Sequence, residues 1–344
     1  MQLADEGQTS RPGEAASAGS PMTTRPHPIS TLIYTAAVIL LVTGPVWVGN
    51  GGIYCRVMAM AFFYGALAYA WNLYSLTGCI SLGHAAFFGL GAYGSGLASH
   101  YLGASPYLTV WIGGGLGALY GILWNVLFRK LRGARLGLAT LASVEIPRVI
   151  IDNWDSFTFG SLGLVGIDSF PGLHVGDVEI DFEDNFRTQY YLLLFTLTAI
   201  GIIHWLFIQS RWGWAARAVR EEESAASMLG VDAVWIRGCA LTLSAFLTGV
   251  CGGLYAHLMG LIEPSMVFSL HISALPLVLS IFGGRYQVLG PVLGALILYP
   301  LDQLVFRSIF PVGHAFLYGL VIITTLMFFP NGVAGWLQQR AKIF

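Results

Sequence analysis

The chain has 344 residues, of which 56% are hydrophobic and only 10% are charged, and its mean hydropathy is +0.69. Soluble domains carry about 25% charged residues, so this composition excludes a soluble globule and indicates an integral membrane protein. The formal net charge of −1 gives no basis for nucleic-acid binding. The four cysteines form no CxxC pair, and we interpret them as isolated apolar residues rather than as metal or redox groups.

The N-terminal region predicts a polar tail followed by a first membrane span. Residues 1–30 are rich in Ser, Pro, Gly and Thr, which is typical of a disordered tail, and we expect this tail in the cytoplasm. The apolar run at 31–49 is long for the core of a signal peptide, and no basic cluster or clear cleavage site accompanies it. We therefore predict that this run crosses the membrane.

Ten segments approach the length of about 20 mainly apolar residues that a membrane span needs. The glycine-rich segment 82–102 is a candidate for a broken or re-entrant element, and 136–151 is short and carries Glu145, Pro147 and Arg148. The expected fold class is all-α, a polytopic transmembrane bundle of about ten spans. The predicted spans are 31–49, 57–76, 82–102, 107–128, 136–151, 190–208, 236–260, 266–282, 289–306 and 314–330.

Loop charges predict how these spans are oriented. Basic residues gather after the fourth, sixth and last predicted spans, and these three sites fall on the same side if ten spans are counted; the positive-inside rule places that side in the cytoplasm. The loop at 152–189 falls on the other side and carries a single basic residue among eight acidic ones. Both termini are therefore expected inside, with one long external loop. The basic residues are Arg129, Lys130, Arg132, Arg135, Arg211, Arg217, Arg220, Arg237, Arg340 and Lys342.

Glycines spaced by four residues predict close packing between helices. This spacing places them on one helix face and lets neighbouring backbones approach. Membrane helices are rich in glycine in general, so any single pair is a weak signal. The sets are Gly113/Gly117/Gly121, Gly249/Gly253 and Gly290/Gly294.

The loop at 209–236 contains the one strongly polar helical stretch, 215–238, that lies between long apolar spans. Basic side chains precede an acidic run there, two alanines follow, and a glycine can end the helix. Such a helix fits a groove on a soluble subunit. The alternative is a solvated amphipathic helix lying on the headgroups, and the residues alone do not decide between the two. The residues concerned are Arg217, Arg220, Glu221, Glu223, Ala225, Ala226 and Gly230.

No sequence motif supplies an energy source or a catalytic centre. The chain contains no GxxxxGK[ST] loop, no HExxH, no GxSxG and no zinc-type spacing of Cys and His. If transport is driven by ATP, another chain must bind the nucleotide, and the polar stretch is where that chain would dock.

Several motifs resemble those of a known family. Residues 223–230, ESAASMLG, resemble the EAA-type loop of bacterial ABC importer permeases, with one extra residue before the alanine pair. Further motifs are similar to the branched-chain amino acid permeases, in unbroken order from about residue 66 to 332. They lie at 71–73, 77–78, 81–89, 140–148, 153–154, 160–164, 211–221, 244–246, 252–256, 283–284 and 290–291.

The resemblance implies a fold and a function. It implies a transmembrane permease domain at 31–338, a coupling loop at 209–236 and a cytoplasmic tail at 339–344. It implies the longer of two permease subunits in an importer of leucine, isoleucine and valine, together with a second permease chain, two ATPases that bind ATP and an external binding protein. The chain itself would hold no cofactor and would lie in the bacterial plasma membrane. Pro147, the segment 155–159 and the acidic loop 177–184 depart from the family pattern and put the substrate in doubt.

Four polar residues inside predicted spans are candidates for the translocation pathway: Asn72, His84, Glu145 and Arg148. Glu145 and Arg148 share a helix face, where they can offer opposite charges to a zwitterion or form a structural ion pair. His84 is expected at the inner mouth of the third span, as a neutral residue bridging helices or as part of a gate. Asn72 can hydrogen-bond between helices.

Three other functions stay open at this point. A permease of the same family can carry urea or short amides instead of amino acids. A secondary transporter driven by ion gradients would need intramembrane carboxylates, for which Glu145 is the candidate. A membrane-embedded enzyme would need a cluster of His, Asp and Glu, and none is evident in the sequence.

Overall fold

The structure, a computed structural model, describes residues 43–44, 52–175, 178–180, 182, 186–311, 313–328 and 332–341. The predicted tail 1–30 and nearly all of the first predicted span, 31–49, lie outside them. The longer helices are α2 (Ile53–Ser75), α3 (His84–Leu102), α4 (Pro106–Phe128), α5 (Gly133–Ala142), α6 (Glu145–Asp152), α8 (Phe186–Gln209), α9 (Arg211–Glu221), α11 (Ala233–Met259), α13 (Leu270–Gly283), α14 (Gly290–Leu301), α16 (His314–Phe328) and α17 (Gly332–Ala341).

Shorter elements connect these helices. Short helical turns are α7 (Asp155–Thr158), the 3-10 turn η1 (Gly160–Leu162), α10 (Glu223–Met228), α12 (Pro264–Val267), the π-helical turn η2 (Asp302–Phe306) and α15 (Arg307–Ile309). Four short strands pair antiparallel in two ribbons, β1 with β4 and β2 with β3. The strands are β1 (Leu164–Val165), β2 (Leu173–Val175), β3 (Val178–Ile180) and β4 (Leu261–Ile262).

Side-chain caps and glycines set several helix ends. The Asp232 carboxylate accepts hydrogen bonds from the backbone N–H groups of Val234 and Trp235 and so begins α11. Gly260, with a φ of 67°, ends the same helix in the left-handed conformation that favours glycine. The hydroxyl of Ser210 caps α9 in the same way as Asp232 caps α11.

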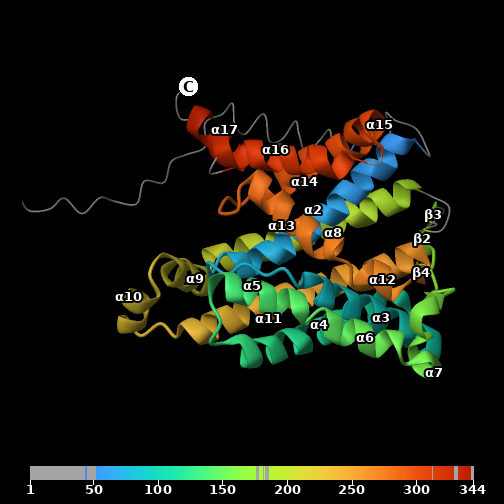
Figure 1. Cartoon of the computed structure of the whole chain (residues 1–344). Coiled ribbons are helices and arrows are strands. Elements are labelled where there is room, and N and C mark those ends of the chain that lie inside the picture. The colour runs from blue at the N-terminus through green and yellow to red at the C-terminus, as the bar shows by residue number, and fades with distance from the viewer. Residues whose placement is uncertain are drawn as a thin grey trace, which may run out of the picture. The chain divides into compact units, whose positions relative to one another are not determined.

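Helix α11 forms the centre of the packing, because α2, α3 and α4 all lie against it (Figure 1). Glycines bring the backbones of α3, α4 and α11 into direct contact. A Cβ atom added to Gly91 would lie 2.2 Å from the carbonyl oxygen of Gly249, and one added to Gly113 would lie 2.4 Å from that of Gly91. The predicted role of Gly113 and Gly249 in close helix packing is confirmed.

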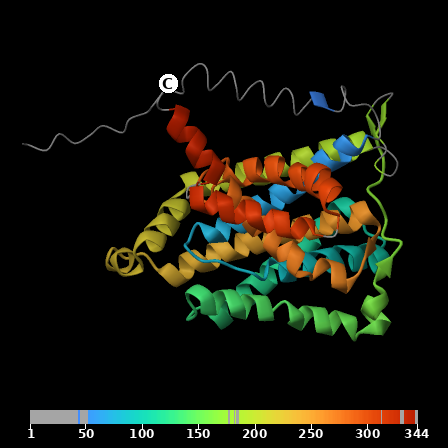
Figure 2. The same ribbon diagram turned by 45° about the horizontal axis from the view of Figure 1, so that its top comes forward.

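A second close pair of helices, α13 and α14, packs against α2, and α13 also contacts α3 (Figures 1 and 2). A Cβ atom on Gly294 would lie 2.0 Å from the carbonyl oxygen of Leu279, and one on Gly283 would lie 1.8 Å from that of Gly290. These two helices therefore form a rigid hairpin, which agrees with the predicted packing role of Gly290 and Gly294.

The all-α membrane bundle is confirmed, but the expected count of about ten spans is too high. In the part of the chain that the structure describes, six helical stretches are long and apolar enough to cross a membrane. They are Ile53–Ser75, Pro106–Phe128, Phe186–Gln209, Ala233–Met259, Pro264–Gly283 and Gly290–Ile309.

Three further predicted spans, all within the described residues, fall short for different physical reasons. The segment predicted at 82–102 forms α3, one unbroken helix of 19 residues rather than a broken or re-entrant element, but its Gly, Ser and His residues keep it from being strongly apolar. The segment at 136–151 divides at Ser143 and Val144 into α5, with 10 residues, and α6, with 8. The segment at 314–330 yields α16, with 15 residues, which is shorter than a span needs.

The connections gather at two ends of the bundle, which we call the α10 end and the strand end (Figure 1). The α10 end holds α9, α10 and the connections between α2 and α3 and between α4 and α5. The strand end holds α7, η1, the four strands and α12, and so contains most of the predicted loop 152–189. Two basic clusters that are far apart in the sequence meet at the α10 end, since Arg132 and Arg237 bind the same carboxylate. This agrees with their predicted position on one side of the membrane.

A network of hydrogen bonds around the buried side chain of His257 stabilises the strand end. Nδ1 of His257, on α11, lies 2.7 Å from the carbonyl oxygen of Asp168, and Nε2 lies 2.9 Å from the Ser95 hydroxyl and 2.8 Å from the Thr109 hydroxyl. Because a carbonyl oxygen only accepts, Nδ1 carries the hydrogen and Nε2 accepts. The hydroxyl of Ser99 also donates to the Asp168 carboxylate, at 3.1 Å. One neutral histidine thus joins α3, α4, α11 and the loop after β1.

Candidate functional site: the α9–α10 loop

The loop between α8 and α11 folds into the two short helices α9 and α10, which project from the α10 end of the bundle (Figure 1). The guanidinium group of Arg217 donates to the carbonyl oxygen of Ile208 at 2.7 Å and so ties α9 back to the last turn of α8. A small apolar cluster made of Val219, Ala226 and Ala233 joins α9, α10 and α11. The loop is therefore a folded unit with its own core.

The two alanines of the loop have different environments. Ala226 is buried in the cluster with Val219 and Ala233, whereas Ala225 is exposed. The small side chain of Ala226 therefore lets α10 pack closely on its neighbours.

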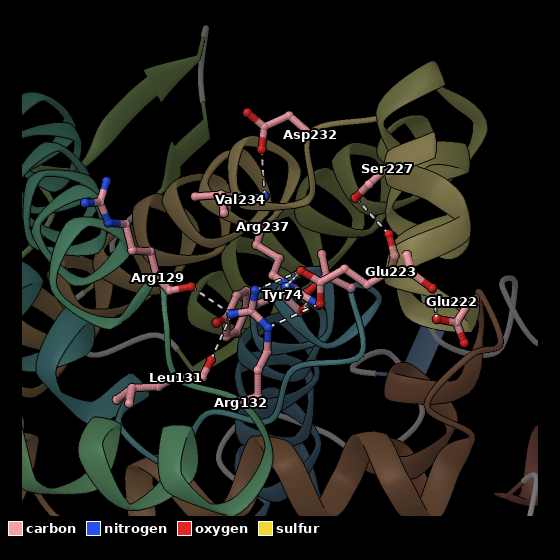
Figure 3. Close-up of polar contacts among 12 residues, drawn as sticks. Tyr74, Arg129, Leu131, Arg132, Glu222, Glu223, Ser227, Asp232, Val234 and Arg237 are labelled. Atoms are coloured by element: carbon pink, nitrogen blue, oxygen red, sulfur yellow. Dashed lines mark hydrogen bonds and ion pairs between the residues drawn. The ribbon is translucent and has the colours of Figure 1, made fainter. Parts of the chain in front are cut away.

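Glu223, the first residue of α10, binds two arginines from different parts of the chain (Figure 3). Arg132, between α4 and α5, donates from Nη2 to Oε1 at 2.8 Å and from Nε to Oε2 at 3.2 Å. Arg237, on α11, donates from Nη1 to Oε1 and from Nη2 to Oε2, each at 2.9 Å. We call this three-residue group the Glu223 clasp. Such paired hydrogen bonds between arginine and carboxylate are both strong and directional.

The clasp changes the chemistry of the Glu223 carboxyl. Hydrogen bonds from Arg237 and Arg132 favour the ionised form and lower the pKa of Glu223 to about 2. The carboxylate is therefore charged throughout the physiological range. Arg132 also donates to the carbonyl oxygens of Arg129 and Leu131, which fixes the backbone of the connection between α4 and α5. A displacement of α10 must therefore move α11 and this connection with it.

The far tip of α10 is apolar and open. The side chains of Met228 and Leu229 are 83% and 84% exposed, the largest exposures among the hydrophobic residues of this loop. Gly230 follows with a φ of 85°, a conformation that strains any residue with a Cβ atom, although nothing lies within 4 Å of the place such an atom would take. This exposed pair lies within the predicted coupling loop, but Met228 and Leu229 were not among its predicted contact residues.

Arg220 and Glu221, at the end of α9, form an ion pair with each other. Glu221 is exposed, while the guanidinium group of Arg220 lies 4.1 Å from the centre of the Tyr286 ring. The sequence analysis assigned both residues to the ATPase-coupling loop. In the structure Glu221 points outward and Arg220 contacts another part of the same chain.

The side chains of Asn72 and His84 are buried and form hydrogen bonds with other groups of the chain. Asn72 donates to the carbonyl oxygen of Arg285 at 2.7 Å and accepts from Nε2 of His204 at 2.9 Å. Nδ1 of His84 lies 3.1 Å from the Ser81 hydroxyl, and its Nε2 lies 2.9 Å from the Ser244 hydroxyl. Both side chains join separate helices, so their polar atoms are already used by protein groups in this conformation.

Glu145 and Arg148 form an ion pair on α6, with a distance of 3.2 Å between Nη1 and Oε1. Their side chains are 58% and 37% exposed, and the neighbouring Ile146 and Val149 are also exposed. Within the described residues, no hydrogen bond or ion pair joins this pair to Asn72 or His84. Asn72 and His84 have no partner in common either, so the structure does not bring the four predicted pathway residues together.

The described residues contain no group of three or more His, Cys, Asp or Glu side chains placed to hold a metal ion. In the α9–α10 loop, Glu221 pairs with Arg220 and Glu223 pairs with Arg132 and Arg237, while the exposed tip is apolar.

Comparisons with known proteins agree with this geometry. The LivM permeases of the high-affinity branched-chain amino acid transport systems of Salmonella typhimurium and Escherichia coli are 26% and 27% identical to the chain, over 91% of this chain and 76% of each relative. The LivH permease of Escherichia coli is 24% identical over 79% of this chain and 91% of that protein. No solved structure matches the chain significantly. The family described as branched-chain amino acid transport system permease component matches residues 53–326, and the chain belongs to this family.

Proposed function

We propose that this protein is a permease subunit of an ATP-driven importer that moves branched-chain amino acids across the bacterial plasma membrane into the cytoplasm. Family membership and the similarity to the LivM permeases support this proposal. The proposed partners are a second permease subunit, two cytoplasmic ATPase subunits that bind the ATP, and an external substrate-binding protein. Both termini and the α10 end lie in the cytoplasm in this proposal, in line with the arginines gathered there.

The observation that carries the proposal is that α10 is fixed to the bundle at one end and exposes apolar side chains at the other. Its tip exposes Met228 and Leu229, which fit an apolar groove on a soluble partner, as helix-in-groove recognition requires. Its other end is fixed by the Glu223 clasp to α11 and to the connection between α4 and α5. Closure of the partner ATPases would push α10, and the clasp would pass that movement to α11, around which α2, α3 and α4 pack.

The ion pair on α6 suggests where the second permease subunit lies. Glu145 and Arg148 are exposed beside apolar residues that are exposed as well. Charged groups facing lipid are unfavourable, so such a pair normally faces protein or a water-filled path. We therefore place the second subunit against α6, with this pair beside the route of the zwitterionic substrate. Asn72 and His84 are then interior residues that hold helices together near that route.

The test is uptake of radiolabelled leucine by proteoliposomes that contain this chain with its partner permease, ATPases and binding protein. Uptake that requires internal ATP, and that excess isoleucine and valine suppress while urea and acetamide do not, supports the proposal. Suppression by urea or short amides instead would favour the alternative substrates. Uptake by the chain alone under an ion gradient without ATP would identify a secondary transporter and overturn the proposal.

The docking surface can be tested separately. Leu229→Ala removes an exposed apolar contact, and we expect ATP-dependent uptake to fall about tenfold, the effect of losing about 1.4 kcal/mol at an interface residue. Leu138→Ala, at an exposed leucine of α5, is the matched control and should leave uptake unchanged. Equal uptake by the two variants would contradict docking at the tip of α10.

A further inference from the structure

Two guanidinium groups lie close to the ring of Tyr286. Tyr286 belongs to the connection between α13 and α14, and the carbon Cζ of Arg220, from α9, lies 4.1 Å from the centre of its ring. The Cζ atom of Arg285, the preceding residue, lies 5.1 Å from the same centre. Both distances are within the range in which a cation is attracted to an aromatic face. One side chain thus joins the α9–α10 loop to the α13–α14 hairpin.

Arg220 reaches this ring from a fixed position. A Cβ atom added to Gly78, in the connection between α2 and α3, would lie 3.1 Å from Cγ and 3.5 Å from Cα of Arg220. Gly78 has a φ of 83°, so the chain needs glycine there for its backbone as well as for this close approach. The Arg220 side chain is only 19% exposed and pairs with Glu221. The stem of Arg220 is therefore held, and its charged end is aimed at Tyr286.

Arg285, the second of these cations, is anchored to the end of α2. Its guanidinium group donates to the Ser75 hydroxyl and, at 3.2 Å each, to the carbonyl oxygens of Ser75 and Cys79. Its own carbonyl oxygen accepts the hydrogen bond from Asn72, which His204 of α8 holds in turn. The connection between α13 and α14 is therefore fixed to the end of α2, and Tyr286 stands on this anchored turn.

The hairpin beyond this turn moves as one body. Gly283, Gly290 and Gly294 bring the backbones of α13 and α14 together without intervening side chains. Packed backbones of this kind shift as rigid units rather than bend. A force applied to the turn at Tyr286 is therefore delivered to both helices.

We propose that the stack of Arg220, Tyr286 and Arg285 transmits movement of the α9–α10 loop to the α13–α14 hairpin, and that Tyr286 is a positioning residue for ATP-driven transport. This inference rests on the proposed function. The Glu223 clasp connects α10 with α11 and with the connection between α4 and α5, while the Tyr286 stack is a second route, which connects the loop with the α13–α14 hairpin. The two routes let one displacement of the α9–α10 loop move both α11 and the hairpin, which pack against α2.

The experiment measures leucine uptake and ATP hydrolysis together in proteoliposomes that contain the complete importer. Tyr286→Leu removes the aromatic face while keeping an apolar side chain, and we expect the leucine transported per ATP hydrolysed to fall by about fivefold or more, with hydrolysis and subunit recovery unchanged. Tyr286→Phe keeps the ring and should restore the wild-type ratio. Tyr54→Leu, at another exposed tyrosine, is the control and should leave the ratio unchanged.

Three outcomes would overturn the inference. The first is a wild-type ratio in Tyr286→Leu, and the second is a Tyr286→Phe variant as defective as Tyr286→Leu, which would exclude the aromatic face as the cause. The third is a parallel loss of uptake, hydrolysis and subunit recovery in Tyr286→Leu, which identifies a structural role alone. If the wild-type complex itself takes up no leucine with ATP, the proposed function fails, and the inference fails with it.

Discussion

At the strand end, a loop is held by neutral hydrogen bonds in a buried place, whereas at the α10 end a short helix is held by a half-exposed carboxylate between two arginines. His257 bridges Ser95, Thr109 and the carbonyl oxygen of Asp168 with almost no solvent contact. Glu223 is 39% exposed and carries its charge openly at the surface of the loop. Buried neutral networks are stable because each group lacks an alternative partner, while exposed ion pairs exchange readily with water. We therefore expect the contacts at the strand end to stay fixed. The ion pairs at the α10 end hold α10 in place, but they can break and form again.

The largest effect is expected at the strand end. His257→Ala removes the hydrogen bonds of His257 with the carbonyl oxygen of Asp168 and with the hydroxyl groups of Ser95 and Thr109, and one hydrogen bond contributes about 0.5–1.5 kcal/mol to stability. We expect a clear fall in the thermal unfolding temperature of the detergent-solubilised protein. His100→Ala, at an exposed histidine of α3, should change stability by less than about 0.5 kcal/mol. Equal unfolding temperatures for the two variants would show that the network does not hold this end.

Next in size is the loss of charge in the clasp. Glu223→Gln keeps the shape but removes the negative charge that faces Arg132 and Arg237, of which Arg237 is only 12% exposed. The pair lies between the exposed and buried cases, so we expect a loss of about 1–2 kcal/mol in stability. Unlike His257→Ala, this variant should also reduce ATP-dependent uptake by the protein that stays folded, because it loosens α10 from α11.

The matched control for the clasp is Glu222→Gln. Glu222 adjoins Glu223 in sequence, is exposed, and accepts a hydrogen bond from the neighbouring Ser224 rather than from a distant arginine. We expect wild-type stability and wild-type uptake from it. If the two variants behave alike, the clasp has no special part in fixing α10, and the contrast between the two ends is lost.

The sequence predicted the helices of the bundle better than it predicted what joins them. Long apolar runs and glycines spaced by four residues were sufficient for the bundle and for the contact of Gly113 with Gly249. The count of spans was too high because apolar composition alone does not register the break at Ser143 and Val144 or the short length of α16. The short strands also escaped prediction, since two or three residues carry no readable alternation.

The sequence predicted a polar helical loop between two apolar helices, but it did not predict which residues this loop contacts. Glu223 is 91 residues from Arg132 along the chain, and Arg220 is 66 residues from Tyr286, so no local pattern could pair them. The spacing of residues shows which side chains share a helix face, but it does not show which helices pack against each other. The exposed pair Met228 and Leu229 was visible as apolar letters inside a polar stretch, and that mismatch was the available signal for a docking tip.

A smaller effect is expected from pH. The pKa of Glu223 is about 2 in the folded protein and near 4.5 when the residue is free, so the clasp contributes fully above pH 4.5 and its contribution is lost as the pH falls toward 2. The difference in stability between the wild type and Glu223→Gln should therefore be constant from pH 8 to pH 5.5 and should shrink below about pH 4.5. Unfolding curves of both proteins over this range measure it. A difference that already falls between pH 7 and pH 6 would contradict the depressed pKa.

The smallest effect is expected from salt, and it separates the two ends most cleanly. At an ionic strength of 1 M the screening length is about 3 Å, so the half-exposed clasp should weaken by less than about 1 kcal/mol. The stability difference between the wild type and Glu223→Gln should narrow as salt rises. The difference between the wild type and His257→Ala should not change, because the hydrogen bonds that His257 makes join uncharged groups. If salt narrows both differences equally, the strand end depends on charge as well, and the distinction between a fixed end and a rearrangeable end fails.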